Sequence, residues 1–198
     1  MTDLPAQKSG QITFGCLNNF CKVSDATLEL WAQTLAAVPE SRMLLHAPEG
    51  ISRERVLEKL PADRVDFAPR LPRRKYMEQY PRIDICLDTL PYNGHTTSLD
   101  AFWMGVPVVT QIGNTVVGRA GWSQLCNLDL RELAASSPEE FVEIAQTLAG
   151  NLSRLMELRG ALRDRMRQSP LMHAQNFARH MEAAYRRVWH DWCQMRWA

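Results

Sequence analysis

Short apolar runs alternate with longer, helix-like segments along the first two thirds of the chain. The short runs are rich in β-branched and aromatic residues and are typical of buried strands. Apolar residues that recur every three or four positions are typical of amphipathic helices. Strands that alternate with helices predict an α/β fold with a doubly wound, mostly parallel sheet. We expect strands at 12–17, 42–47, 64–67, 83–87 and 106–110, and a possible short sixth strand at 128–130.

From Pro138 onward the pattern is helical only. Apolar residues continue at spacings of three and four past Gly160, and a last helix is expected at about 173–193, with tryptophans and methionines that we interpret as packing residues. We therefore expect three parts. They are a disordered leader at 1–10, a strand-and-helix domain at 11–137, and a helical extension at 138–198 that packs on it.

The composition fits one domain of ordinary size. The chain has 198 residues, of which 45% are hydrophobic and 23% charged. Its formal net charge is +1, which gives no overall electrostatic case for nucleic acid or a membrane surface as partner. Any phosphate site must therefore be local.

The five cysteines are scattered along the chain without a Cys-x-x-Cys pair, so neither a zinc site nor a disulfide framework is indicated. Reduced thiols fit a cytoplasmic protein. The first ten residues lack the apolar region of a signal peptide, and no run approaches the roughly 18 apolar residues of a membrane span.

A polar turn at 91–98 joins the end of one expected strand to the start of a helix that stops at Gly105. The first turn of a helix leaves about four amide groups without intrahelical acceptors and carries a partial positive charge, so it can hold a phosphate. Thr96 and Thr97 add hydroxyl donors, and Gly94 allows close approach of the backbone and tolerates a positive φ. The simpler interpretation is that Thr97 or Ser98 only caps the helix. Asp100 favours the ligand interpretation, because its carboxylate can accept two ribose hydroxyl groups.

The motif NGHTTSLD at 93–100, with DT at 88–89 before it and WMGVPVVT at 103–110 after it, resembles the donor-binding segment of the O-linked N-acetylglucosamine transferase / SPINDLY-like glycosyltransferase family. The resemblance covers about residues 11–193. It implies a GT-B fold with two Rossmann-like lobes, of which this chain is the C-terminal, nucleotide-sugar-binding lobe. It also implies that the helical tail packs back across the junction of the lobes.

Lys22 follows the first expected strand, at the same edge of the sheet as the turn at Gly94. On the residues alone it is a solvated surface lysine. The resemblance implies more, because NNFCK at 18–22 aligns with the family's asparagine-rich loop, whose lysine contacts the donor diphosphate. Lys22 matches that lysine and is our candidate for stabilising charge on the departing diphosphate. Asn19 stands where the family has a polar amide that reaches the phosphates.

The resemblance also assigns the turn residues. Without it, His95 is a half-exposed loop histidine and Asp100 an acid stabilised by the helix dipole. With it, Gly94, His95, Thr96 and Thr97 contact the donor, and Asp100 matches the ribose-binding aspartate. The related fucose-transferring branch usually has threonine at the position of His95, so this histidine favours the N-acetylglucosamine branch.

A basic stretch at 70–75 is, on the residues alone, a solvated helix start. The resemblance places the nucleobase here. The family has a lysine where Arg73 falls and a histidine near the uracil where Tyr76 falls. Arginine keeps the charge with another geometry, and tyrosine keeps a stacking face. Leu71 would offer only its backbone to the base, and these departures leave the identity of the base open.

The implied activity is inverting transfer of N-acetylglucosamine from UDP to Ser or Thr hydroxyl groups of a polypeptide, with UDP-GlcNAc as donor substrate and no cofactor. The sequence has no Asp-x-Asp motif, which favours metal-independent transfer. The other GT-B lobe, with the family's proposed catalytic histidine, and the tetratricopeptide repeats have no counterpart here. We therefore expect the lobe to be inactive alone.

Three other functions stay open. The chain can be a non-catalytic nucleotide-binding or interaction module, or half of an O-fucosyltransferase that uses GDP-fucose. An NAD-binding Rossmann domain fits least, because the first loop, at 16–22, lacks the Gly-x-Gly-x-x-Gly fingerprint.

Overall fold

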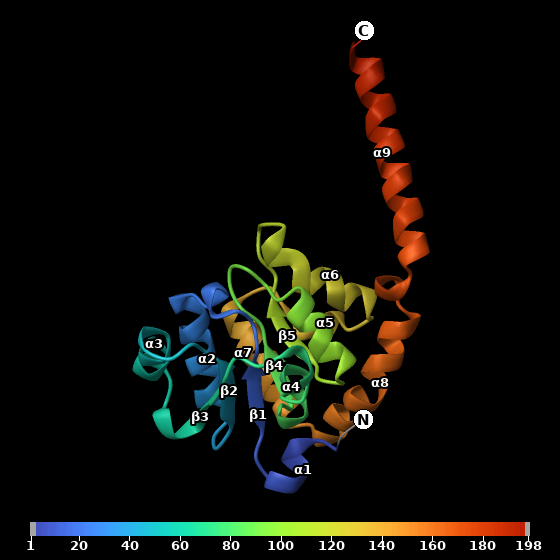
Figure 1. Ribbon diagram of the computed structural model, residues 1–198. Coiled ribbons are helices and arrows are strands. Elements are labelled where there is room, and N and C mark those ends of the chain that lie inside the picture. The colour runs from blue at the N-terminus through green and yellow to red at the C-terminus, as the bar shows by residue number, and fades with distance from the viewer. Residues whose placement is uncertain (1–2, 197–198) are drawn as a thin grey trace.

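The computed structural model describes residues 3–196 and has one parallel sheet with helices around it (Figure 1). The strand order is β3-β2-β1-β4-β5-β6, and every neighbouring pair is parallel. The predicted α/β class and doubly wound sheet are confirmed. The strands are β1 (Thr13–Cys16), β2 (Arg42–His46), β3 (Val65–Ala68), β4 (Ile85–Leu87), β5 (Val108–Gln111) and β6 (Ala134–Ala135).

The helices lie mostly in the intervals that the apolar spacing predicts. Helix α2 packs beside α7, and α5 packs beside α8, so that apolar faces of all four are buried. Trp31, Phe14, Phe102 and Phe141 are the large residues at the centre of the core. The α-helices are α1 (Pro5–Ser9), α2 (Asp25–Ala37), α3 (Ile51–Lys59), α4 (Arg73–Met77), α5 (Thr96–Trp103), α6 (Ala120–Asn127), α7 (Pro138–Ala149), α8 (Leu152–Gln168) and α9 (Ala174–Arg196), with short 3-10 turns between several of them.

The strand order places a switch point between β1 and β4. The chain builds β2 and β3 on one side of β1 and then returns to build β4, β5 and β6 on the other side. The loops that leave β1 and β4 therefore diverge, and a crevice forms at their carboxyl ends, which is where open α/β sheets bind ligands.

The prediction of a disordered leader is wrong for the part of it that the structure describes; Met1 and Thr2 lie outside the described residues. Helix α1 is ordered because Leu4 and Ala6 are buried and the Ala6 amide donates to Asp84 Oδ1 at 3.0 Å. The amide of Thr13 donates to the other oxygen of the same carboxylate at 2.8 Å.

Helix α8 reaches the same end of β4 from the other side. Arg159 is buried and donates from Nη1 to the carbonyl of Ile83 at 3.1 Å. Helices α1 and α8 therefore both fasten the start of β4, at the edge of the sheet opposite the crevice.

The expected strand at 128–130 is also wrong. Leu128 and Leu130 are buried, as in a strand, but they close the turn after α6, and Asp129 between them has a φ of 54°, which is incompatible with an extended chain. The sixth strand is instead β6, paired with the end of β5.

The helical extension differs from its prediction in two ways. It breaks at Gly150, which the continuous apolar spacing does not predict, because Asn151 accepts the Arg154 amide and caps a new helix, α8. Helices α7 and α8 pack on the sheet domain, but α9 projects away from it (Figure 1). The expectation that tail tryptophans pack on the domain is wrong for Trp189, which is 60% exposed and stacks on Trp192; Trp197 lies outside the described residues.

Candidate functional site

The loop after β4 is held from beneath by one buried carboxylate. Asp88 is 2% exposed and accepts hydrogen bonds from the Gly94 amide at 2.6 Å, the Thr89 amide at 2.9 Å and the Thr110 hydroxyl at 2.7 Å. These bonds fold the loop back over the end of β4. The Gly94 amide is therefore fully used inside the turn.

The structure does not use the positive φ that a glycine tolerates at position 94, and the close approach of a ligand there stays a prediction. The φ of Gly94 is not in the left-handed region. A Cβ at this position would collide with Ser98 Oγ and lie 3.0 Å from Thr97 Oγ1. Glycine is therefore needed here for space, because the turn packs against the first turn of α5.

Helix α5 begins immediately after this turn. His95 is its N-cap residue but makes no side-chain cap hydrogen bond. Thr96 is exposed and Thr97 half-buried, so the start of the helix faces the crevice. The amides of its first turn have no acceptor within the helix and can donate to a ligand. The Thr97 hydroxyl donates to Asn18 Oδ1 and so ties α5 to the end of β1.

Lys22 reaches this turn from the loop after β1. Its Nζ donates to the carbonyl of Asn93 at 3.0 Å and lies 4.0 Å from the centroid of the Tyr92 ring. The predicted meeting of Lys22 with the turn at Gly94 is thus present in the structure. Partial burial lowers the pKa of Lys22 from its usual 10.5, and the nearby Asp88 opposes this shift.

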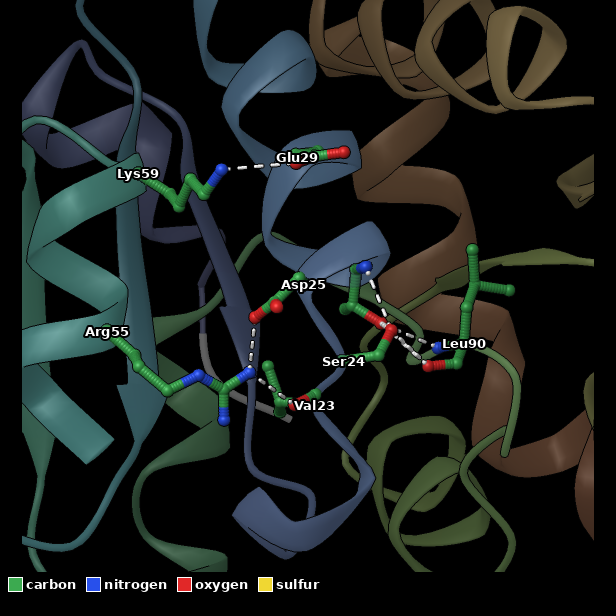
Figure 2. Close-up of polar contacts among 8 residues, drawn as sticks. Val23, Ser24, Asp25, Glu29, Arg55, Lys59 and Leu90 are labelled. Carbon is green, nitrogen blue, oxygen red and sulfur yellow. Dashed lines mark hydrogen bonds and ion pairs between the residues drawn. The ribbon is translucent and has the colours of Figure 1, made fainter. Parts of the chain in front are cut away.

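Two hydroxyl groups hold the Lys22 loop against the loop after β4. Ser24 Oγ donates to the carbonyl of Leu90 at 2.8 Å (Figure 2). Thr27 Oγ1 both donates to that carbonyl and accepts the Leu90 amide. Helix α3 braces the other side of α2, where Arg55 pairs with Asp25 at 2.7 Å. Lys22 therefore sits on a loop with a fixed position.

His95 has a buried ring nitrogen. Its Nε2 is buried and has no hydrogen-bond partner among the described residues, although its carbonyl accepts from Gln124 Nε2 at 3.1 Å. A buried ring nitrogen without a partner is costly to a fold, and a bound ligand can satisfy it. Asn19 lies near Lys22 in the sequence. Its Oδ1 caps a short 3-10 turn by accepting the Cys21 amide at 3.2 Å, and its Nδ2 is the group that can donate to a phosphate.

The basic stretch lies beside α5. Arg73 forms a two-pronged ion pair with Asp100, with N···O distances of 2.5 and 2.6 Å. Tyr76 is half-buried, and its hydroxyl lies 2.6 Å from that of Tyr80, which in turn donates to the Thr97 carbonyl at 3.0 Å. Leu71 is half-buried just before α4. The structure therefore brings Arg73, Tyr76 and Asp100 together.

Three residues of this site have no role that the sequence predicts. Asp88 supports the turn, Asn18 joins it to β1, and Asn93 is fully buried and holds the turn through its Nδ2, which donates to the Thr89 carbonyl at 3.1 Å. A polar residue directly after a buried strand is the signal that would have found Asp88. A small pocket between the ends of β1 and β4 has Asn18, Asp88, Thr97 and Ser98 among its lining residues.

Two further features are absent from residues 3–196. They contain no group of three or more His, Cys, Asp or Glu side chains arranged to hold a metal ion. None of their helices combines the length and apolar character needed to cross a bilayer. The binding roles, the metal independence and the cytoplasmic location remain predictions.

Comparison with known proteins gives a family match over most of the chain. The family model of glycosyl transferase family 41 matches residues 3–181. The probable UDP-N-acetylglucosamine–peptide N-acetylglucosaminyltransferase SPINDLY of Hordeum vulgare is 38% identical over 198 residues, which cover 96% of this chain and 21% of that protein. The chain thus spans about one fifth of the length of such relatives.

Solved structures show the same fold. A K341M mutant of the Thermobaculum terrenum O-GlcNAc transferase superposes with a TM-score of 0.84 and 37% sequence identity, over 93% of this chain and 37% of that one. Sucrose-phosphate synthase from Thermosynechococcus elongatus has a TM-score of 0.60 at 17% identity, over 94% of this chain and 49% of that one. At that identity the likeness concerns the fold alone.

Proposed function

Because this chain belongs to glycosyl transferase family 41, we propose that it is the UDP-sugar-binding lobe of an inverting protein O-GlcNAc transferase. The observation that carries the proposal is the meeting of the Lys22 ammonium with the loop that leads into α5, where Nζ lies 3.0 Å from the Asn93 carbonyl. A positive side chain and a helix start then face the same crevice, which suits a diphosphate.

Lys22 is our candidate for catalysis by charge stabilisation. An ammonium group has three N–H donors, and the Asn93 carbonyl takes one, so two stay available for phosphate oxygens. Negative charge grows on the diphosphate as the bond to the sugar breaks, and a fixed cation at that position lowers the barrier. The amides of Thr96 and Thr97 and the unpartnered Nε2 of His95 would add neutral hydrogen bonds.

Asp100 and its neighbours are proposed to hold the nucleoside. A carboxylate has about four lone-pair sites, and the ion pair with Arg73 uses two of them. Arg73 therefore orients Asp100 and leaves it able to accept ribose hydroxyl groups. Tyr76 would stack on the base, and Leu71 would contact it through its backbone.

The remaining parts of the enzyme are proposals as well. The relatives are about five times longer than this chain, and we propose that the N-terminal GT-B lobe and tetratricopeptide repeats supply the catalytic base and bind the Ser/Thr polypeptide. The chain alone would then bind UDP and transfer little or no sugar.

Calorimetric titration with UDP and GDP tests this function. We expect UDP to bind the wild-type chain more tightly than GDP. Lys22→Met and Asp100→Asn should each weaken UDP binding by about 10- to 100-fold, the usual value of a charge-assisted hydrogen bond. Arg74→Ala is the control, because Arg74 lies beside Arg73 on α4 but its side chain is 94% exposed and pairs only with Glu78 in the described chain.

Absence of UDP binding at millimolar concentration, or equal binding in all variants, would refute the proposal. Tighter GDP binding would favour the fucosyltransferase alternative.

A further inference from the structure

The ring of Tyr92 contacts two groups of the candidate site. The Lys22 ammonium is 4.0 Å from the ring centroid. The imidazole of His95 also lies near it, at 5.3 Å from centroid to centroid and with an interplanar angle of 37°. Lys22 comes from the loop after β1 and His95 from the loop after β4, so the Tyr92 ring links the two loops.

The backbone of Tyr92 is fixed, whereas its side chain is not buried. Its carbonyl accepts the Thr89 hydroxyl at 2.6 Å, and Thr89 Oγ1 in turn accepts from Asn18 Nδ2 at 2.9 Å. The residue is 39% exposed, and its phenol makes no hydrogen bond to any residue in 3–196. Core packing therefore does not explain the aromatic ring, but its contact with Lys22 does.

We propose that Tyr92 is a positioning residue of the diphosphate site, whose ring face holds the Lys22 ammonium beside the turn at Gly94. This inference rests on the proposed function. The electron-rich face of an aromatic ring attracts a cation without a formal negative charge. It can therefore hold Lys22 in place while the full positive charge stays available to phosphate. A carboxylate at this position would pair with Lys22 and repel the diphosphate.

The other ionisable groups around Lys22 do not hold its ammonium group in place of Tyr92. Asp88 lies beneath the turn and its oxygens are occupied by Thr89, Gly94 and Thr110. Cys16 and Cys21 are the remaining groups that act on the Lys22 charge. The direct contacts of the Lys22 ammonium in the described chain are thus the Asn93 carbonyl and the Tyr92 ring.

Ligand binding separates this role from a general effect on the fold. We expect Tyr92→Leu to weaken UDP binding about three- to tenfold, as loss of a cation–π contact predicts, and Tyr92→Phe to restore it because phenylalanine keeps the ring face. Uridine, which lacks phosphate, should bind wild type and Tyr92→Leu equally in an NMR titration. In a Lys22→Met background, Tyr92→Leu should have no further effect. Tyr185→Leu is the control, because Tyr185 is 68% exposed on the projecting α9.

A spectroscopic measurement tests the contact without any ligand. Stacking on the ring should shift the Lys22 ε-proton resonances upfield, with the shift lost in Tyr92→Leu and retained in Tyr92→Phe. Equal losses of UDP and uridine affinity, an undiminished effect in the Lys22→Met background, or absence of the ring-current shift would overturn the inference. If wild type fails to bind UDP, the proposed function fails. If UDP binding needs Lys22 but not Tyr92, only the inference fails.

Discussion

Asp88 shows how a single buried residue sets the shape of the candidate site. All three of its described hydrogen-bond partners are neutral, and two of them are backbone amides of the loop that it supports. Burial raises the pKa of this carboxyl above 3.8, against the effect of the hydrogen bonds and of Lys22. Burial of the Asp88 carboxylate therefore destabilises the folded state, while its hydrogen bonds fix the conformation of the turn.

This cost has a predictable dependence on pH. Because the pKa is higher in the folded state than in the unfolded state, the folded protein holds the proton more strongly, and stability is lost as pH rises from 3.8 through the raised pKa. Asp88→Asn keeps the shape, since its oxygen can accept the Gly94 amide and its amide can donate to Thr110. We expect the free energy of unfolding of the variant, relative to that of wild type, to rise with pH across this window. Above the raised pKa of Asp88 the difference should no longer change with pH. Urea unfolding at a series of pH values measures this.

Asp164→Asn is the matched control, because the Asp164 side chain is 65% exposed and its ion pair with Arg167 lies at the surface. Its stability difference from wild type should lack the rise expected for Asp88→Asn. A pH-independent difference for Asp88→Asn would contradict the assignment of a buried, ionisable carboxyl.

Some contacts of the candidate site can be predicted from the sequence and others cannot. The meeting of Lys22 with the Gly94 turn follows from sheet topology, because both loops leave carboxyl ends of neighbouring strands. The ion pair of Arg73 with Asp100 does not follow from topology. It depends on the orientation of the short helix α4, and a run of basic residues gives no indication of which one pairs with Asp100.

At the scale of elements, the start of α5 depends on the absence of a side chain at Gly94. A methyl group there would collide with the Ser98 hydroxyl and crowd the Thr97 hydroxyl, so these side chains of the first turn must move, and such overpacking costs about 1–3 kcal/mol. We expect Gly94→Ala to lower the melting temperature by several degrees and to weaken UDP binding at least about tenfold. Thermal unfolding and calorimetry measure the two effects.

Gly160→Ala is the opposite case and serves as the control. Gly160 lies inside α8, and a methyl group added there would meet no atom within 4 Å outside its own helix backbone. Alanine is favoured over glycine in a helix by about 0.5–1 kcal/mol, so this variant should be slightly more stable and bind UDP normally. Similar behaviour of the two variants would show that the crowding at Gly94 is not real.

Apolar spacing predicts elements well where burial and secondary structure agree. It finds the strands that become β1 to β5 and most of the helices. It fails at Leu128 and Leu130, where apolar residues are buried by a turn, and at α1, where a single leucine and a distant carboxylate order a polar segment. The break at Asn151 depends on a side-chain cap rather than on hydrophobicity.

At the scale of the whole molecule, α9 stands apart from the rest. It contacts the domain mainly through the short turn before it, and its apolar residues Phe177, Tyr185, Val188 and Trp189 are exposed. We expect a chain that ends at His173 to keep its UDP affinity and to unfold within about 3 °C of the full chain. The full chain should self-associate with rising concentration, because a continuous apolar face on a helix favours contact with other copies.

Sedimentation velocity and thermal unfolding of both chains test this. Loss of cooperative unfolding in the shortened chain would show that α9 stabilises the domain. Monomeric behaviour of the full chain at high concentration would contradict self-association through the apolar face of α9.

The fastening of β4 by α1 and by α8 bears on synthesis at the ribosome. Arg159 binds the carbonyl of a residue 76 positions earlier, so a nascent chain that has already emerged through all the strands still lacks this bond. The N-terminal helix can engage Asp84 much sooner. Translation therefore has to deliver about the first half of α8 before Arg159 can bind the amino end of β4. A ribosome that stalls earlier leaves that end of the sheet without this bond.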